Sequence, residues 1–392
     1  MKGGTRKMKR FIIIFLAVFV VIVGCQAVTD GKNVNNVTTQ NVSEASKYYD
    51  FAKEYLKNKM FDSAIRNYRS AIVESTAFID AYIGLGKSFE GKFDYTRAES
   101  VYNYMIDAFP KNAEGFNSYG FMYLTIKEYT NAEKQFTNAL KVDSMNSKAY
   151  DGLGQVYEKQ KPSNSKLSAL TCYEKACTYD PENIAVSYRF AKALIKSDKY
   201  EKAVDLLKKV SDDHPTFIEP ITNLADAYVE IKEYKNAINA YNKVLDLDST
   251  YFNAFLGIAR SYEALNDYSN AETYYKKLMN VKPNSTIPHL YLAQMYLTLK
   301  NYDKTIDILN TALSKNQNDE NALIMIAQAY FFKVDPQKVK DANRDEAYGY
   351  LDKSEEYFNK IINMNGKYSS DAKKGLENVK KRRKEIDPNR WQ

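Results

Sequence analysis

Residues 218–251 decide the fold, and they read IEPITNLADAYVEIKEYKNAINAYNKVLDLDSTY. Ala237, in the middle of this segment, has counterparts on both sides at a nearly constant spacing. Successive members of the series lie 34 residues apart, except for one interval of 37, and the other members are Ala64, Ala98, Ala132, Ala169, Ala203 and Ala271. A period of this length indicates that one small supersecondary unit is repeated along the chain, which predicts a solenoid.

Large apolar residues keep the same register as the alanine. In the quoted segment Tyr228 precedes Ala237 by nine residues, Tyr234 precedes it by three, and Tyr241 follows it by four. A large residue followed by a small one, here Leu224 and Ala225, stands earlier in each unit. Several units close with a proline, which cannot continue a helix; these are Pro110, Pro181, Pro215 and Pro283.

Together these positions resemble the tetratricopeptide repeat, in which two antiparallel helices form each 34-residue unit. The resemblance implies an all-α fold, a right-handed α-solenoid of about nine repeats over residues 44–365. Residues 366–392 are expected to form a C-terminal capping helix and a basic tail. The nine units begin near Ala45, Ile79, Ala113, Ser147, Ile184, Ile218, Phe252, Thr286 and Glu320.

Two units depart from the pattern. Residues 162–165 lengthen the turn inside the fourth unit by three residues, and residues 332–344 insert an Asp335-Pro336 turn into the ninth. A surface insertion that the fold tolerates explains both, because loop length adds little closure entropy. A loop that enters the groove or grips a partner is the alternative.

The first 24 residues are expected to be a lipoprotein signal peptide. Basic residues precede the apolar run of residues 11–23, which is shorter than the about 20 residues that a spanning helix needs. The run ends Ile22-Val23-Gly24-Cys25, which resembles the lipobox of bacterial lipoproteins. The resemblance implies diacylation of Cys25, and either Met1 or Met8 serves as the start. Residues 25–43 then form the acylated cysteine and a flexible tether.

This reading predicts a protein held at a membrane outside the cytoplasm, because two acyl chains anchor a protein stably. Gln26 follows the cysteine where an aspartate could stand. By analogy with enteric bacteria, that favours the periplasmic face of an outer membrane if the organism has two membranes.

The charge balance argues against nucleic acid as a partner. The formal net charge is +7, but residues 1–24 carry five basic groups and no acidic ones, so the rest of the chain has 51 minus 49, or +2. Residues 373–392 contribute eight basic and three acidic groups, which leaves the repeats near −3. A nucleic-acid protein is expected to present a broad basic face.

Signals of catalysis are sparse, and we expect neither an enzyme nor a cofactor or metal site. The chain has two histidines, without partners in a metal or nucleophile pattern. Cys172 and Cys177 lie five residues apart on one helix, so their Cα atoms are about 8 Å apart, beyond disulfide reach. The segment Gly84 to Ser88 resembles the end of a phosphate-binding loop, but it falls inside a repeat helix.

The groove of the fifth unit offers a small basic cluster. By family analogy, positions 2, 5, 6, 9, 12 and 13 of each repeat line the concave face. In the fifth unit these positions include Tyr188, Arg189, Lys192 and Lys196, which could hold an acidic segment or a chain terminus. A solvated charged face is the alternative, because neighbouring units contribute Asp151 and Asp226 instead of more lysines.

The eighth and ninth units offer an apolar strip at the same positions. Its candidates for partner binding are Leu290, Tyr291, Ile324, Met325, Phe331 and Phe332, with Ile287 and Leu297 beside them. An exposed strip of this size usually marks a protein contact. The insertion at residues 332–344 or tighter winding could instead cover it.

The sequence therefore favours a membrane-anchored scaffold for protein–protein interactions in the bacterial cell envelope, with a peptide or partner protein in the concave groove. One alternative is an accessory factor of envelope polysaccharide or peptidoglycan machinery. Another is a structural lipoprotein that associates with itself through the apolar strip.

Overall fold

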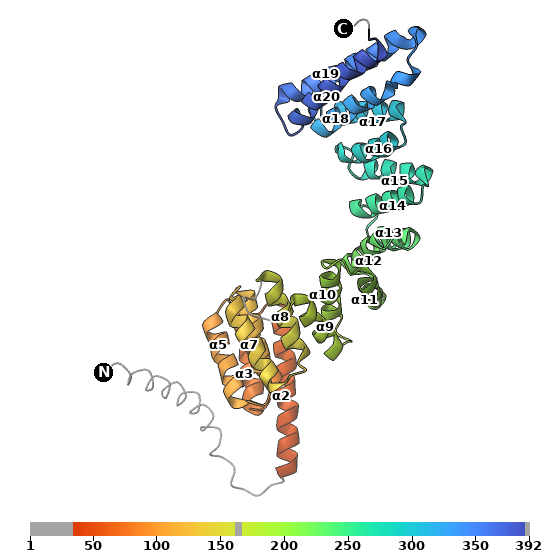
Figure 1. Ribbon diagram of the computed structural model, residues 1–392. Helices are drawn as coiled ribbons and strands as arrows, with labels where there is room; N and C mark the ends of the chain where they lie inside the picture. Colours follow the sequence, from red (N-terminus) through yellow and green to blue (C-terminus); the bar gives the residue numbers. More distant parts are fainter. Residues whose placement is uncertain (1–33, 161–166, 389–392) are drawn as a thin grey trace, which may run out of the picture. The chain divides into compact units, whose positions relative to one another are not determined.

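The computed structural model describes residues 34–160 and 167–388. Throughout these ranges the regular elements are helices, as the all-α solenoid prediction requires (Figure 1). The chain divides into two compact units, residues 1–193 and residues 194–392, and each is described by itself.

The N-terminal unit consists of helix pairs that follow the predicted repeats. Each pair joins a first helix to a second one across a short turn. The pairs are α2 (Val34–Lys57) with α3 (Phe61–Glu74), α4 (Ile79–Gly91) with α5 (Tyr95–Ala108), α6 (Glu114–Thr125) with α7 (Tyr129–Val142), and α8 (Ser147–Lys159) with α9 (Ala169–Tyr179); α10 (Ile184–Ile195) follows.

The C-terminal unit continues the series. Its helices are α11 (Tyr200–Asp213), α12 (Ile218–Glu230), α13 (Tyr234–Leu247), α14 (Phe252–Ala264), α15 (Tyr268–Val281), α16 (Ile287–Thr298), α17 (Tyr302–Lys315), α18 (Glu320–Lys333), α19 (Arg344–Met364) and α20 (Ser369–Ile386). Two short 3₁₀ turns, η1 (Pro336–Lys338) and η2 (Asp341–Asn343), form the insertion of the ninth unit. The insertion is followed by α19, which is the long second helix of the ninth unit.

A left-handed residue follows the first helix in repeats one to three and five to eight. In the first repeat Lys59 has φ 58°, its N–H donates to the Leu56 carbonyl, and the next N–H donates to the Tyr55 carbonyl. These bonds satisfy carbonyls that a helix end leaves open. Equivalent left-handed residues are Phe93, Lys127, Asp198, Lys232, Asn266 and Lys300.

The recurring aromatic of the second helix fills the gap between first helices. Phe136 on α7 is fully buried, and a Cβ added to Gly120 on α6 or to Gly152 on α8 would approach its ring to 2.7 or 2.2 Å. Glycine is therefore required where the ring contacts these two backbones. The recurring alanines pack beside it, since Ala132 is also fully buried.

The last helix caps the C-terminal unit as predicted. Helix α20 buries Ala372, Val379 and Ile386, and Gly375 lies against the Phe358 ring of α19. Its outward face carries exposed Lys380, Lys381 and Lys384, and the largely covered Arg383 between them forms ion pairs with two acidic residues of α19. The polar face thus meets solvent while the apolar face closes the stack.

The N-terminal boundary differs from the sequence expectation. Residues 34–43, which we expected within the tether, form the first turns of α2. Adding residues to an existing helix is easier than starting one, so the packed part of α2 can carry the helix toward the N-terminus. Residues 1–33, which include Cys25, and the insertion at residues 162–165 lie outside the described residues.

Candidate functional site

The N-terminal unit has a groove formed by the first helices of successive repeats. It has a volume of about 800 Å³ and is lined by α2, α4, α6 and the start of α8. We call it the N-terminal groove. Residues on its walls include Lys53, Leu56, Asp80, Ile83, Lys87, Glu114, Asn117, Phe121 and Lys148.

These residues occupy the repeat positions that the sequence assigns to the concave face. Counting from Ile79, positions 2, 5 and 9 are Asp80, Ile83 and Lys87, and all three line the groove. The position rule therefore finds this site. Sequence reasoning instead favoured later repeats, because their side chains at these positions are more uniformly basic or apolar.

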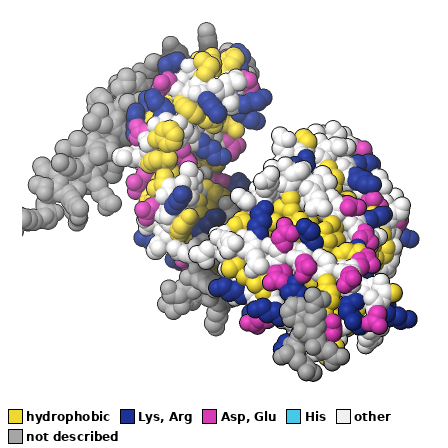
Figure 2. Space-filling view, turned by 90° about the horizontal axis from the view of Figure 1, so that it is seen from above, with side chains coloured by type: hydrophobic (Ala, Val, Ile, Leu, Met, Phe, Trp, Pro, Cys, Tyr) yellow, Lys and Arg dark blue, Asp and Glu magenta, His cyan; other side chains and the backbone are white. Residues whose placement is uncertain are grey.

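Side chains of both charges line the N-terminal groove. Lys53, Lys87 and Lys148 contribute positive charge, and Asp80, Glu90 and Glu114 contribute negative charge. Lys148 and Glu114 form an ion pair of 2.8 Å between α8 and α6. The visible surface in Figure 2 likewise interleaves basic and acidic side chains. Such a groove can align a partner that carries both charges, and it does not favour a polyanion.

Glu90 is a half-buried charged residue of the groove wall. It accepts a hydrogen bond from the Tyr102 hydroxyl on α5. Burial raises the pKa of Glu90, while the Tyr102 bond and nearby Lys87 partly oppose the shift. Burial also raises the pKa of Tyr102, with the charge of Glu90 adding to the effect. The Glu90 carboxyl group is therefore hydrogen-bonded to Tyr102, whose ring packs on Gly86.

Asn117 provides a buried acceptor beside the groove. Its side chain is 1% exposed, and its Nδ2 donates to Asn146 Oδ1 over 3.1 Å. Asn146 Oδ1 also accepts from the Ala149 N–H, which fixes the direction of the amide. The Oδ1 atom of Asn117 has no hydrogen-bond partner among the described residues. A buried acceptor of this kind is costly unless a donor reaches it.

The predicted basic cluster of the fifth repeat is only partly available. The Arg189 guanidinium makes two hydrogen bonds to Asp151, at 2.6 and 2.8 Å, and the Asp151 side chain is nearly buried. Lys192 is exposed and lies 5.5 Å from the centre of the half-buried Tyr188 ring. Lys196 is exposed and directly follows α10. The charge of Arg189 is therefore already compensated within the fold.

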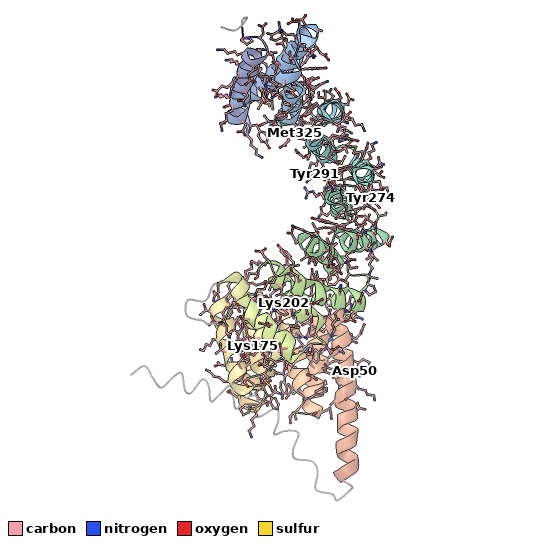
Figure 3. The ribbon with its side chains drawn as sticks, turned by 45° about the vertical axis from the view of Figure 1, so that its right-hand side comes forward. Asp50, Lys175, Lys202, Tyr274, Tyr291 and Met325 are labelled. Atoms are coloured by element: carbon pink, nitrogen blue, oxygen red, sulfur yellow. The ribbon has the colours of Figure 1, made fainter. Side chains whose placement is uncertain are left out.

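The predicted apolar strip is less exposed than the sequence indicated. Ile324 is buried, and Leu290, Tyr291, Met325 and Phe331 are half-buried (Figure 3 labels Tyr291 and Met325). Phe332 is 47% exposed, and Ile287 is 48% exposed. Much of the strip thus packs on its own unit.

Helix α20 accounts for part of that cover. The Arg382 guanidinium lies 4.5 Å from the centre of the Phe331 ring. Residues of α18 and α20 line a smaller hollow of about 330 Å³ that includes Ile324, Phe331 and Phe332. The capping helix, and not the insertion alone, therefore forms the facing wall.

The described residues hold no group of three or more His, Cys, Asp or Glu side chains placed to bind a metal ion. Across the described ranges, none of the helices has the length and apolar character needed to cross a bilayer.

Comparison with known families supports the tetratricopeptide repeat. A profile described as tetratricopeptide repeat matches residues 218–251, the segment quoted at the outset. Profiles for the C-terminal and the fourth ARM domains of tetratricopeptide repeat protein 21 match residues 113–223 and 258–386. These matches support repeats of the tetratricopeptide type over the segments concerned.

Particular proteins match different extents of the chain. The C-terminal part of a TPR repeat-containing protein from Cytophaga hutchinsonii is 19% identical with a TM-score of 0.50, covering 62% of this chain and 99% of that chain. The Protein CTR9 homolog of Arabidopsis thaliana is 27% identical over 31% of this chain. Superkiller protein 3 of Schizosaccharomyces pombe is 25% identical over 38% of it. The chain spans 11% of the length of each curated relative.

Proposed function

We propose that this chain is a lipid-anchored scaffold of the bacterial cell envelope whose N-terminal groove holds a segment of a partner protein. The groove carries the proposal, because four successive first helices present a continuous wall with apolar, acidic and basic positions. Asn117 Oδ1 supplies a buried acceptor that a backbone N–H of a bound segment would satisfy after a small adjustment of the wall.

The mixed charge of the groove favours recognition over catalysis. Leu56, Ile83 and Phe121 offer apolar contacts, and the lysines and carboxylates around them set the register of the partner. The solenoid type of fold suggests protein or peptide partners, in keeping with this chemistry.

Membrane attachment through Cys25 is the second part of the proposal. It rests on the basic and apolar segments before the cysteine and on the lipobox-like residues 22–25. A diacylated Cys25 would hold the repeats at an extracytoplasmic membrane face, where the groove would meet envelope proteins.

A photo-crosslinking amino acid at Lys87 tests the groove. Lys87 is exposed within the groove, and Lys134 on α7 is exposed outside it. In living cells the crosslinker at Lys87 should capture a defined partner, and the crosslinker at Lys134 should not. The double substitution Lys53→Glu and Glu114→Lys, read out through a crosslinker at Thr125, should reduce capture. Equal capture from both positions would refute the groove assignment.

Anchoring is tested separately with Cys25→Ser. The unaltered chain should take up a labelled fatty acid and sediment with membranes, whereas the variant should do neither. Uptake of label by the variant would refute lipidation at this cysteine and leave the groove proposal untouched.

A further inference from the structure

Helix α20 carries a row of exposed lysines on the side opposite its buried residues. Ala372, Val379 and Ile386 recur every seven residues and are buried. With 3.6 residues per turn, the exposed lysines fall within an arc of about 120° on the other side, in a row about 17 Å long. We call this row the lysine face, and its members are Lys373, Lys374, Lys380, Lys381 and Lys384.

The charges of the lysine face are not compensated within the C-terminal unit. None of its five ammonium groups has a hydrogen-bond or ion-pair partner among the described residues. The carboxylates nearby are already engaged, because two acidic residues of α19 pair with Arg383 and Glu385 pairs with Arg382. Exposed Glu377 stands among the lysines, so the face has a net charge of five minus one, or +4.

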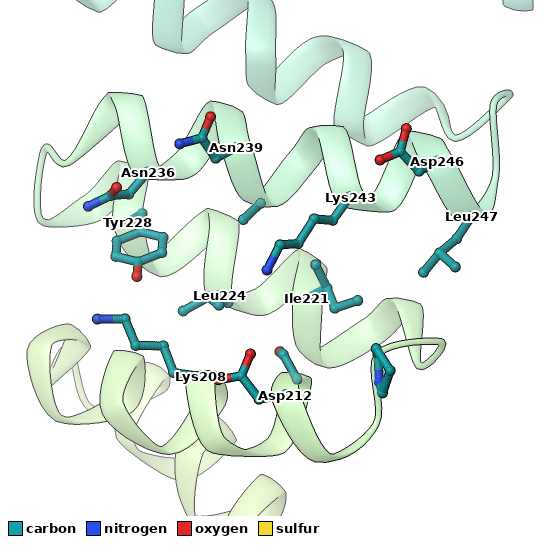
Figure 4. Close-up of a pocket in the computed structure, with 13 residues that line it drawn as sticks. Lys208, Asp212, Ile221, Leu224, Tyr228, Asn236, Asn239, Lys243, Asp246 and Leu247 are labelled. Atoms are coloured by element: carbon teal, nitrogen blue, oxygen red, sulfur yellow. The ribbon is translucent and has the colours of Figure 1, made fainter.

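Other lysines of this unit have different surroundings. Helices α11, α12 and α13 line a hollow of about 600 Å³, in which Lys243 reaches toward Asp212 and Lys208 lies at the end formed by Tyr228 (Figure 4). The Lys208 ammonium is 5.7 Å from the centre of the Tyr228 ring. Both lysines are exposed, yet each has a carboxylate or an aromatic ring nearby. They therefore provide a control for net charge alone.

The chemistry of the lysine face favours a fluid anionic surface over a folded partner. The exposed residues of α20 are all polar or charged, so the helix offers no apolar anchor of the kind that dominates protein interfaces. A nucleic acid is expected to meet a broad basic surface, and this row is only one helix wide. Lipid headgroups rearrange around lysines of any spacing, and clustered lysines on a helix attract anionic bilayers.

Trp391 is a second, independent feature of the same region. It is the single tryptophan of the sequence and follows the last residue of α20 by five positions, which span at most about 17 Å. Tryptophan is enriched at the interface of bilayers, where its ring lies among the headgroups. Its side chain is outside the described residues, so only its place in the sequence enters the argument.

We propose that the lysine face and Trp391 contact the headgroups of an anionic lipid bilayer. Each lysine near such a surface strengthens binding about fivefold, and Trp391 holds the end of the helix at the interface. This contact goes beyond the proposed scaffold. It requires neither acylation of Cys25 nor a partner in the N-terminal groove.

The fluorescence of Trp391 tests the proposal in the full chain. The chain is reconstituted with vesicles of phosphatidylcholine, or of phosphatidylcholine with about one-third phosphatidylglycerol. Excitation is at wavelengths that the 33 tyrosines do not absorb. In the anionic vesicles alone, the emission should shift to shorter wavelengths and be quenched by brominated lipid. Both kinds of vesicle accept the apolar residues 11–23, so a difference between them does not report on that segment.

Salt gives a check on the electrostatic origin of the shift. Raising the ionic strength from about 0.1 M to about 1 M shortens the screening length from about 10 Å to about 3 Å. The emission of Trp391 in anionic vesicles should then return to its position in neutral vesicles.

Charge reversal at two lysines separates the lysine face from net charge. Lys380→Glu with Lys384→Glu lowers the charge of the face from +4 to 0 and should abolish the shift. Lys208→Glu with Lys243→Glu makes the same change in net charge at the hollow of Figure 4 and should retain the shift. Circular dichroism confirms that both variants keep their helices.

Acetylation of lysines, mapped by mass spectrometry, gives a readout that does not depend on Trp391. Anionic vesicles should protect the lysine face severalfold and leave Lys208 and Lys243 as reactive as in neutral vesicles. Protection without a shift in emission would overturn the part assigned to Trp391.

Three outcomes would overturn the proposal as a whole. One is that emission and acetylation are the same in both kinds of vesicle. Another is that the Lys208 and Lys243 variant loses the shift as completely as the lysine-face variant, which would show a response to net charge alone. The third is that duplex DNA protects the lysine face as well as anionic vesicles do, which would make it a site for polyanions in general.

Discussion

Gly152→Ala is expected to destabilise the N-terminal unit through one contact. The added Cβ would lie 2.2 Å from the Phe136 ring, which is fully buried and also faces Gly120. Overpacking of this kind costs about 1–3 kcal/mol, and the upper part of that range applies because the enclosed ring has no room to move. Alanine regains about 1 kcal/mol over glycine within a helix. The net loss should therefore be about 2 kcal/mol.

The reasoning is tested in a second background, Phe136→Ala. Loss of the ring alone should cost about 3–5 kcal/mol. With the ring absent, Gly152→Ala should become neutral or stabilising by about 1 kcal/mol, so the coupling between the two sites is about 3 kcal/mol. Hydrogen exchange of α7 and α8 amides measures this local stability, because solenoid repeats open as neighbours. An equal loss from Gly152→Ala in both backgrounds would refute the contact as its cause.

Three other predictions follow from local environments. Gly349 lies exposed on α19 with open space at its Cβ position, so Gly349→Ala should stabilise the C-terminal unit by about 0.5–1 kcal/mol in urea denaturation. Burial raises the folded-state pKa of Glu90, so its stabilising contribution is full below the unfolded pKa and is lost as pH rises through the folded pKa. The unfolding free energy of the unaltered chain minus that of Glu90→Gln should therefore increase as the pH is lowered from 7 to 4. Burial raises the pKa of the Cys172 thiol to about 12, so iodoacetamide at pH 8 should label half-buried Cys177 first, as mass spectrometry would show.

The fold could be predicted because packing repeats with the chain. Ala132 and Phe136 recur at fixed offsets since each repeat must fit the same neighbours, and their burial confirms the role. The left-handed turn residues carried no such signal. Lys59 and Phe93 adopt positive φ without being glycine, because the two carbonyl hydrogen bonds at the end of the first helix stabilise the turn.

The sequence predicts which positions of a repeat line a groove, but not which repeats enclose one. The inner-face rule selects Asp80, Ile83 and Lys87 in the same way as residues of any other repeat. Which repeats enclose a hollow depends on helix packing over several units, and the sequence of one repeat does not carry that information. The same limit explains Arg189. Whether its charge is available to a ligand depends on Asp151, which lies 38 residues earlier in the sequence.

Positions that repeat cannot by themselves specify a partner, because they satisfy the same packing requirement in every unit. Specificity must reside where successive repeats differ and where side chains remain outside the core. In the C-terminal unit Lys208 on α11 meets this condition, because its side chain is exposed and its equivalent on α13 is Asn242. The N-terminal groove meets it on the first helices. One repeated scaffold can thus recognise a partner through the exposed positions at which its repeats differ.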